Sequence, residues 1–326
     1  MPTTLIYLAI IAVIIFLGLR YRRQHRPASP QSLSLQNSPP PQAQLSPKTQ
    51  VAMEAAIQQF INATQKPSIL LTATSSQNTP ITASKLGGTP YLPQGFEYPH
   101  AKCGKPLKLL AQLNFDTLPK LPNYPATGLL QFYILPNDFY GLNVDDFRNN
   151  HVQDTFRVVY HKESTQNQAG NLPDLSYYED NFPVTGEFLL TGTIESISMS
   201  ASADNFRDTF KAFCKDYSHL DLFAPYFASE NTEDAGEIDD LLMTHLEYEG
   251  GTRIGGYPYF TQYDPRAEQM LEKYNLLLLQ IDSEYDDENH EYSVAWGDSG
   301  VGNFFINAED LKNCVFDDVL YNWDCF

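Results

Sequence analysis

The sequence predicts an α+β fold in which two related, β-rich halves (an internal duplication) share one core, preceded by a single transmembrane helix. Three observations support this prediction. Blocks of residues return about 168 positions later, strand-like and helix-like segments are interspersed along the chain, and an uncharged apolar segment stands at the amino terminus. With 326 residues, of which 42% are hydrophobic, the chain is long enough to bury a sizeable core.

Residues 1–19 are predicted to form a membrane anchor. Residues 2–19 carry no charge, and at about 1.5 Å per residue they would span roughly 27 Å, close to the thickness of a bilayer core. The alternative, a cleaved signal peptide, needs positive charge before the apolar stretch, whereas here the arginines at 20, 22, 23 and 26 follow it. The positive-inside rule then predicts a single-pass protein, attached through residues 5–19, with its N-terminus outside and its C-terminal domain cytoplasmic.

A linker over residues 20–46 and a folded domain over 47–326 are predicted to follow. The linker is first basic and then rich in Pro, Ser and Gln, a composition that buries too little apolar surface to order itself. Ser46 followed by Pro47 marks the start of a helix, because Ser is a favoured N-cap and Pro fits the first helical turn. Apolar residues at helical spacing continue as far as Ile61, and Pro67 ends this helix.

Further elements follow from local patterns. Residues 68–74 are typical of a strand. We predict other strands over 157–160 and 187–193, and helices over 206–217, 238–246, after Asp264-Pro265 and after Asn307.

The repeat is the strongest feature of the folded part. Residues 85–91 (KLGGTPY) return at 253–259 (RIGGYPY), 109–114 (LLAQLN) at 277–282 (LLLQID), and 128–134 (GLLQFYI) at 300–306 (GVGNFFI). We therefore predict repeat halves near 84–134 and 252–306. The Gly-Gly pair in each copy suggests a tight turn or a close backbone approach, and it lacks the spacing of a phosphate-binding loop.

Polar residues inside or near the repeated strands are the candidate binding residues. Gln112 and Gln280 stand within apolar runs, and a buried amide must be hydrogen-bonded. Pairing with backbone across the pseudo-twofold axis is one reading. The other is a polar pocket shared by the halves, with Asp282, Trp296 and Asp298 nearby.

Other motifs give no catalytic residue, metal ligand or cofactor site. Residues 297–300 (GDSG) resemble the nucleophile loop of trypsin-like proteases, but Val301 replaces the next glycine and the upstream histidine block is missing, so a turn is predicted. The acidic segment 282–291 lacks the glycine and the final glutamate of an EF-hand loop, which favours a solvated hairpin. The seven histidines lack zinc-site spacing. Cys214 lies in an aromatic stripe and is predicted to be a buried thiol.

Several of these motifs also resemble the YwqG-like family, a bacterial domain of unknown function. The resemblance covers 47–326 and rests on motifs at 84–93, 106–107, 110–113, 128–132, 254–258, 278–282, 296–300, 303–306 and 321–325. This chain has Tyr98 before Pro99 where the family often has tryptophan, so an aromatic residue is kept. The resemblance implies an α+β fold and supplies no catalytic residues.

Charge bears most directly on function. The chain has 21 Lys and Arg against 40 Asp and Glu, a net charge of −19, and five of the basic residues lie within 1–50, where no acidic residue occurs. The remainder therefore carries 16 positive and 40 negative groups, or −24. This excludes a general nucleic-acid-binding protein, because phosphate binding needs a basic face.

We therefore expect an acidic, non-enzymatic binding or regulatory module of an immunity-like kind, with a basic protein as its partner. The alternative is a small-ligand or metal-dependent enzyme with a site between the two repeats.

Overall fold

The computed structural model describes residues 45–144, 147–164, 172–175, 178, 181–229, 236–247, 250–268, 271–286 and 291–326. The predicted anchor at 1–19 and all but the last two residues of the predicted linker lie outside these ranges.

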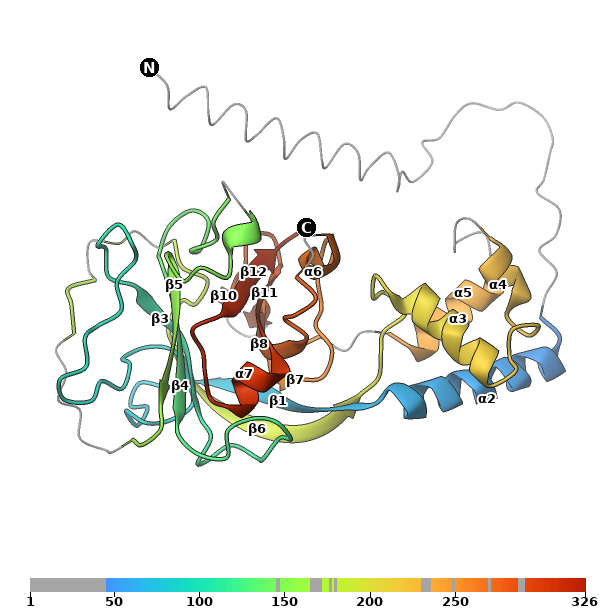
Figure 1. Cartoon of the computed structure of the whole chain (residues 1–326), viewed down its shortest axis with the longest axis horizontal. Coiled ribbons are helices and arrows are strands. Elements are labelled where there is room, and N and C mark those ends of the chain that lie inside the picture. The colour runs from blue at the N-terminus through green and yellow to red at the C-terminus, as the bar shows by residue number, and fades with distance from the viewer. Residues whose placement is uncertain are drawn as a thin grey trace, which may run out of the picture. The chain divides into compact units, whose positions relative to one another are not determined.

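Over these residues, one ten-stranded antiparallel sheet dominates the fold (Figure 1). Its strand order is β12-β11-β8-β7-β1-β6-β2-β3-β4-β5. The strands are β1 (Lys66–Ser75), β2 (Lys85–Gly87), β3 (Lys108–Asn114), β4 (Leu129–Ile134), β5 (Phe156–His161), β6 (Glu187–Ile197), β7 (Arg253–Gly255), β8 (Leu276–Asp282), β11 (Val301–Ile306) and β12 (Val319–Asp324). A separate hairpin joins β9 (Glu284–Asp286) to β10 (Glu291–Val294).

The strand order is symmetric about the β1–β6 pair. Strands β2, β3 and β4, which carry the first set of repeated blocks, lie as far from this centre as β7, β8 and β11, which carry the second. Strand β1 precedes the first block yet pairs with β7, whereas β6 precedes the second block and pairs with β2. The strand that precedes each set in sequence therefore pairs with the other set. Strands β1 and β6 pair with each other at ten positions and so join the two sets.

The sheet curls until its two edge strands approach each other. Phe156 on β5 lies 5.4 Å from Tyr321 on β12, measured between ring centres. The segment before β5 bridges the remaining gap. The Gln153 side chain accepts the N–H of Val158 at 2.7 Å and donates to the carbonyl of Phe316 at 2.6 Å. The Tyr321 N–H donates to the Asn150 carbonyl at 2.9 Å. The resulting, nearly closed sheet encloses the main apolar core.

Four helices pack together around a second core at one end of the sheet (Figure 1). Phe60 lies at its centre, with the rings of Phe206, Phe210 and Phe213 edge-on within 5.7 Å. We call this the helix cluster: α2 (Pro47–Thr64), α3 (Phe206–Asp216), α4 (Ala224–Ala228) and α5 (Glu237–His245). The shorter helices are the 3-10 helix Phe147–Asn149, α6 (Pro265–Glu268) and α7 (Ala308–Lys312).

The predicted α+β class is wrong. The described chain is a nearly closed antiparallel sheet with few helices, and the longer ones lie in the helix cluster. Most predicted helices and strands do form, and Ser46 caps α2 by accepting the N–H of Thr49. The error arose because strands interspersed with helices suggest mixed layers, while the order along the chain does not specify that the helices gather around a core of their own.

The predicted transmembrane helix and single-pass topology are likewise corrected. Among the residues that the structure describes, no helix has the length and apolar character needed to cross a bilayer. Residues 5–19, on which the prediction rested, lie outside the described ranges. An uncharged run of 18 residues is near the lower limit for a membrane span, so its length alone was weak support. The outside–cytoplasm localisation depended on this helix and is withdrawn with it.

Candidate functional site

Gln112 and Gln280 occupy matching places in the two sets of strands. Gln112 on β3 is fully buried and accepts the N–H of Tyr91 at 3.0 Å. Gln280 on β8 is fully buried and accepts the N–H of Tyr259 at 2.8 Å, and its own amide donates to the Gly251 carbonyl at 2.9 Å. Four strands separate β3 from β8. Each glutamine therefore fixes a loop of its own half, and the two do not share a pocket.

The neighbouring strands add a second matching contact. Gln131 on β4 donates to the carbonyl of Tyr91 at 2.7 Å, and Asn303 on β11 donates to the carbonyl of Tyr259 at 2.8 Å. Two amide side chains thus hold the backbone of each tyrosine on both its N–H and its carbonyl side. These contacts give the repeated polar residues a structural role.

The other three predicted residues lie around the end of β8. Asp282 accepts the N–H of Gly251 at 2.7 Å, and burial raises the pKa of its carboxyl, while backbone hydrogen bonds and Arg253 oppose that rise. Trp296 is fully buried and packs edge-on against Tyr140. Asp298 is exposed in the turn before β11. Their role as binding residues stays a prediction.

A buried histidine extends the polar contacts of the first half. His161 on β5 hydrogen-bonds through Nε2 to the side-chain oxygen Oε1 of Gln131 at 2.9 Å, and the Phe96 ring lies edge-on to it at 4.9 Å. Burial lowers the pKa of His161 to about 4. The neutral imidazole is therefore the form that the folded protein favours.

We expect His161 to make stability depend on pH under acid conditions. The unfolded chain takes up a proton near pH 6.5 and the folded chain only near pH 4, so stability is lost as the pH falls through this window. Between pH 7 and pH 5 the loss from this group is about 2 kcal/mol. Urea unfolding across that range should show a smaller acid loss for His161→Gln than for the wild type. The exposed His100→Gln is the control for replacing a histidine. An unchanged pH dependence for His161→Gln would contradict the expectation.

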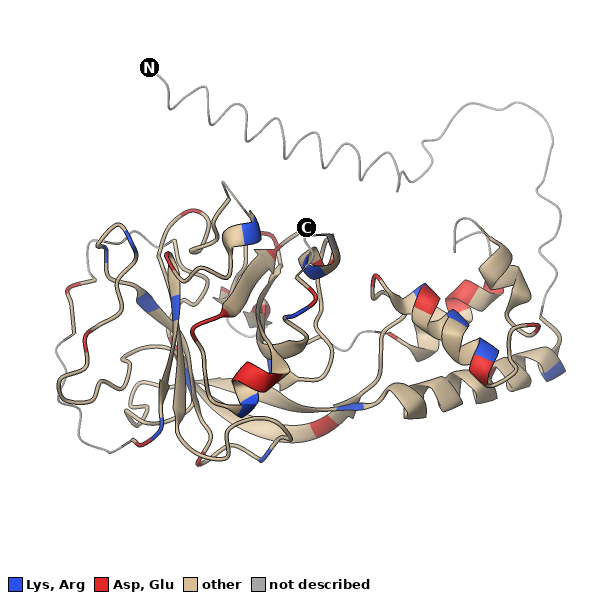
Figure 2. Cartoon of the chain, in the orientation of Figure 1, with Lys and Arg blue, Asp and Glu red and all other residues tan. Residues whose placement is uncertain are grey.

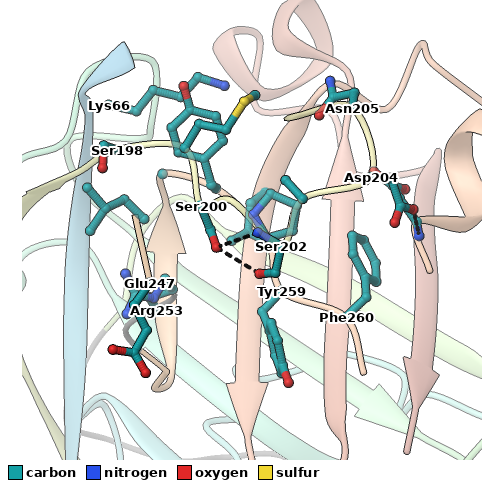
Figure 3. Close-up of a pocket in the computed structure, with 18 of the residues that line it drawn as sticks. Lys66, Ser198, Ser200, Ser202, Asp204, Asn205, Glu247, Arg253, Tyr259 and Phe260 are labelled. Atoms are coloured by element: carbon teal, nitrogen blue, oxygen red, sulfur yellow. Dashed lines mark hydrogen bonds between the residues drawn. The ribbon is translucent and has the colours of Figure 1, made fainter. Parts of the chain in front are cut away.

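A cleft with a volume of about 400 Å³ lies between the helix cluster and the sheet (Figure 3). One wall is the end of β6 and its connection to α3, where serines alternate along the chain: Ser196, Ser198, Ser200 and Ser202. The other is the loop after β7, which carries the aromatic residues Tyr257, Tyr259 and Phe260. None of the five predicted site residues lines this cleft.

Two of the three Lys and Arg side chains that line the cleft already contact a carboxylate. Arg253 is buried and pairs with Glu195 at 2.8 Å. Arg266 donates from two nitrogens to Asp264, at 2.6 Å for the shorter contact. Lys66, the third, places its ammonium 4.0 Å from the centre of the Tyr257 ring. Partial burial, and then the charge of Arg266, lowers the pKa of Lys66.

A carboxylate on the last strand fixes the aromatic wall. Asp324 on β12 accepts the N–H groups of Thr261 and Gln262, both at 3.2 Å. Burial raises the pKa of Asp324 to about 6, and the charge of Asp204 adds to the rise, although the two backbone hydrogen bonds oppose it. Asp204 in turn accepts the N–H of Asp264 at 2.6 Å, which links the serine wall to the same loop. The two walls are therefore tied together at one end.

The sequence contains a signal for this cleft that the prediction of site residues missed. Four serines stand at every second position from 196 to 202, directly after a predicted strand. Alternating positions in an extended segment share one face, so this pattern indicates a hydroxyl-bearing face. The aromatic wall lies next to the second Gly-Gly pair, for which the sequence suggested only a turn or a close backbone approach.

Metal and thiol chemistry find no obvious site in the described ranges. There, no three His, Cys, Asp or Glu side chains lie close enough together to hold a metal ion. All four cysteines are free. Burial raises the pKa of Cys214 to about 12, as befits a thiol in the helix cluster.

Comparison with known proteins places the chain in a family without a defined activity. No curated protein matches it. A family model described as a domain of unknown function (DUF1963) matches residues 84–325, which include both sets of repeated blocks and both walls of the cleft. Because this match spans well over half of the chain, the protein belongs to the DUF1963 family.

Proposed function

We propose that this chain is a binding module that takes a ligand in the cleft between the helix cluster and the sheet. The observation that carries the proposal is the cleft itself, because its volume of about 400 Å³ falls within the range of small-molecule sites. The cleft lies where two separately packed parts of the chain, the helix cluster and the sheet, meet, and ligand sites commonly form at such junctions.

The serine pair and the two arginines of the cleft favour binding over catalysis. Catalytic serines need a base within hydrogen-bond reach, but Ser200 and Ser202 bond to each other at 2.7 Å. Arg253 and Arg266 are committed to Glu195 and Asp264. Groups already held in this way shape a surface and position a ligand, whereas general acid–base chemistry needs a group free to exchange a proton.

Filling the cleft should abolish binding. Ser202 is exposed and lines the cleft, so Ser202→Trp adds bulk there at little expense to the core. Gln77→Trp places the same side chain on an exposed loop away from the cleft and serves as the control. We expect a thermal-shift screen of sugars, amino acids, nucleotides and short peptides to give compounds that stabilise the wild type and Gln77→Trp but not Ser202→Trp. No stabilising compound, or equal stabilisation of all three proteins, would overturn the proposal.

A basic protein partner is the second candidate, favoured by the net charge of −19. Figure 2 marks Asp and Glu positions in red along the ribbon, on the helix cluster as well as on the sheet and its loops, rather than in one place. Such a spread would speed the approach of a basic partner more than it would define a docking face. Deca-lysine should then bind strongly at low salt, weakly at high salt, and equally to Ser202→Trp.

We also propose that the chain is YwqG-like within its family. The motifs from 84 to 325 that carry this resemblance all fall inside the range of the family match.

A further inference from the structure

The serine wall offers many hydrogen-bonding groups of mixed character. Ser196, Ser198, Ser200 and Ser202 line it, followed by Asn205. A hydroxyl both donates and accepts, and an amide does the same through separate atoms. This wall therefore matches a ligand whose own groups also do both.

The opposite wall offers rings. Tyr257, Tyr259 and Phe260 line the cleft. Figure 3 shows the Phe260 ring at the same end of the cleft as Asp204, where the two walls are tied together. Phe260 is partly buried and stacks on Phe305 with ring centres 5.9 Å apart, so its orientation is supported from behind. A ring held in this way can cover an apolar face of a ligand.

The charges of the cleft argue against an anionic ligand. Among its described lining residues, Lys66 is the only Lys or Arg without a carboxylate partner, whereas Asp204 and Glu247 both line the cleft. Phosphate and carboxylate recognition usually combines several charged donors. The chain as a whole also carries −19, a field that repels anions.

We infer that the cleft binds a neutral, hydroxyl-rich ligand of the carbohydrate class, an inference that rests on the proposed binding function. The hydroxyls of a sugar donate and accept and so match the serine wall and the Asp204 and Glu247 carboxylates. Its C–H faces match the ring of Phe260. Because the ligand carries no charge, its affinity depends little on salt.

The inference is tested by calorimetric titration of the full chain with neutral trisaccharides, namely maltotriose, cellotriose, mannotriose and triacetylchitotriose. We expect at least one to bind with similar affinity at about 0.05 M and about 0.5 M NaCl. Phe260→Ala should weaken that binding about tenfold, the equivalent of about 1.4 kcal/mol for a lost ring contact. Ser202→Trp should abolish it and Gln77→Trp should leave it unchanged. If Phe260→Ala fails to fold, Ser202→Trp still decides the outcome.

Three results would overturn the inference in distinguishable ways. If inorganic phosphate or an amino acid binds and is blocked by Ser202→Trp while no sugar binds, the carbohydrate class is wrong and the binding function stands. If a sugar binds equally to Ser202→Trp, the site lies elsewhere and the cleft assignment fails. If neither the sugars nor the wider panel binds the wild type, both proposals fail.

Discussion

Replacing Glu187 by glutamine is expected to destabilise the protein by about 4 kcal/mol, since it leaves a buried ammonium without its counter-ion. The side chain of Lys85 is only 1% exposed, and its Nζ lies 3.0 Å from the Glu187 carboxylate. Its other hydrogen bond goes to the carbonyl of Thr89 at 2.9 Å. A neutral amide at 187 keeps the shape of the site but removes the charge that compensates the ammonium.

A second variant separates the charge effect from the loss of side-chain contacts. In Lys85→Met/Glu187→Leu both charges disappear together, and apolar replacement of a whole buried pair is often neutral or stabilising. We therefore expect the double variant to be more stable than Glu187→Gln alone. Urea unfolding gives both free energies. The exposed Glu97→Gln, a control for removing one negative charge, should stay within about 0.5 kcal/mol of the wild type. A similarly small change for Glu187→Gln would contradict the argument.

The pair also illustrates what the repeat preserves in three dimensions. Arg253, which is 168 positions after Lys85, pairs with Glu195 at 2.8 Å and is equally buried. Both glutamates lie on β6, the central strand that pairs with β1 on one side and with β2 on the other. Because both cations reach the same strand, the ion pairs fasten the two sets of strands to the centre of the sheet.

Local patterns predicted the elements well, because caps and periodicity depend on neighbours in sequence. The N-cap at Ser46 and the buried stripe through Phe60 follow from residues within one helix. Asn307 caps α7 as its sequence predicts, accepting the N–H of Glu309. Such features need no knowledge of the rest of the chain.

The arrangement of the elements could not be predicted in the same way. The Ser68 hydroxyl donates to the carbonyl of Ile254, a contact across 186 positions. The gap between the edge strands is bridged by Gln153 and Phe316, 163 positions apart. Nothing in either local sequence specifies the other partner. The curled sheet and the separate helix cluster follow from such contacts, and they decide the fold class.

The same distinction applies to the candidate site. Gln112 and Gln280 were expected to be buried and hydrogen-bonded, and they are. Their partners belong to their own halves, because the amide of each reaches a loop that the repeat places beside it. The cleft escaped prediction because its two walls, around Ser200 and Phe260, meet only once the helix cluster has packed against the sheet.

A large effect of a single added methyl group is expected at Gly87. This residue has φ +62°, and a Cβ there would lie 2.2 Å from the carbonyl oxygen of Gly186. That distance is far below van der Waals contact. Because the obstructing atom belongs to the backbone, the overlap is relieved only if β2 moves away from β6. Gly87 is paired with Glu187 in that ladder, so the shift would also disturb the ion pair of Lys85.

Gly95 provides the matched control, because it has φ +79° and no atom lies within 4 Å of the place that an added methyl group would occupy. Gly95→Ala should cost about 1 kcal/mol, the conformational penalty of a left-handed residue with a side chain. Gly87→Ala should cost about 4 kcal/mol or more, because the overlap with Gly186 adds to that penalty. Urea unfolding of both variants measures the difference. Equal losses would mean that β2 can move at little expense, and the Gly-Gly pair would then serve the turn alone rather than the close approach of two strands.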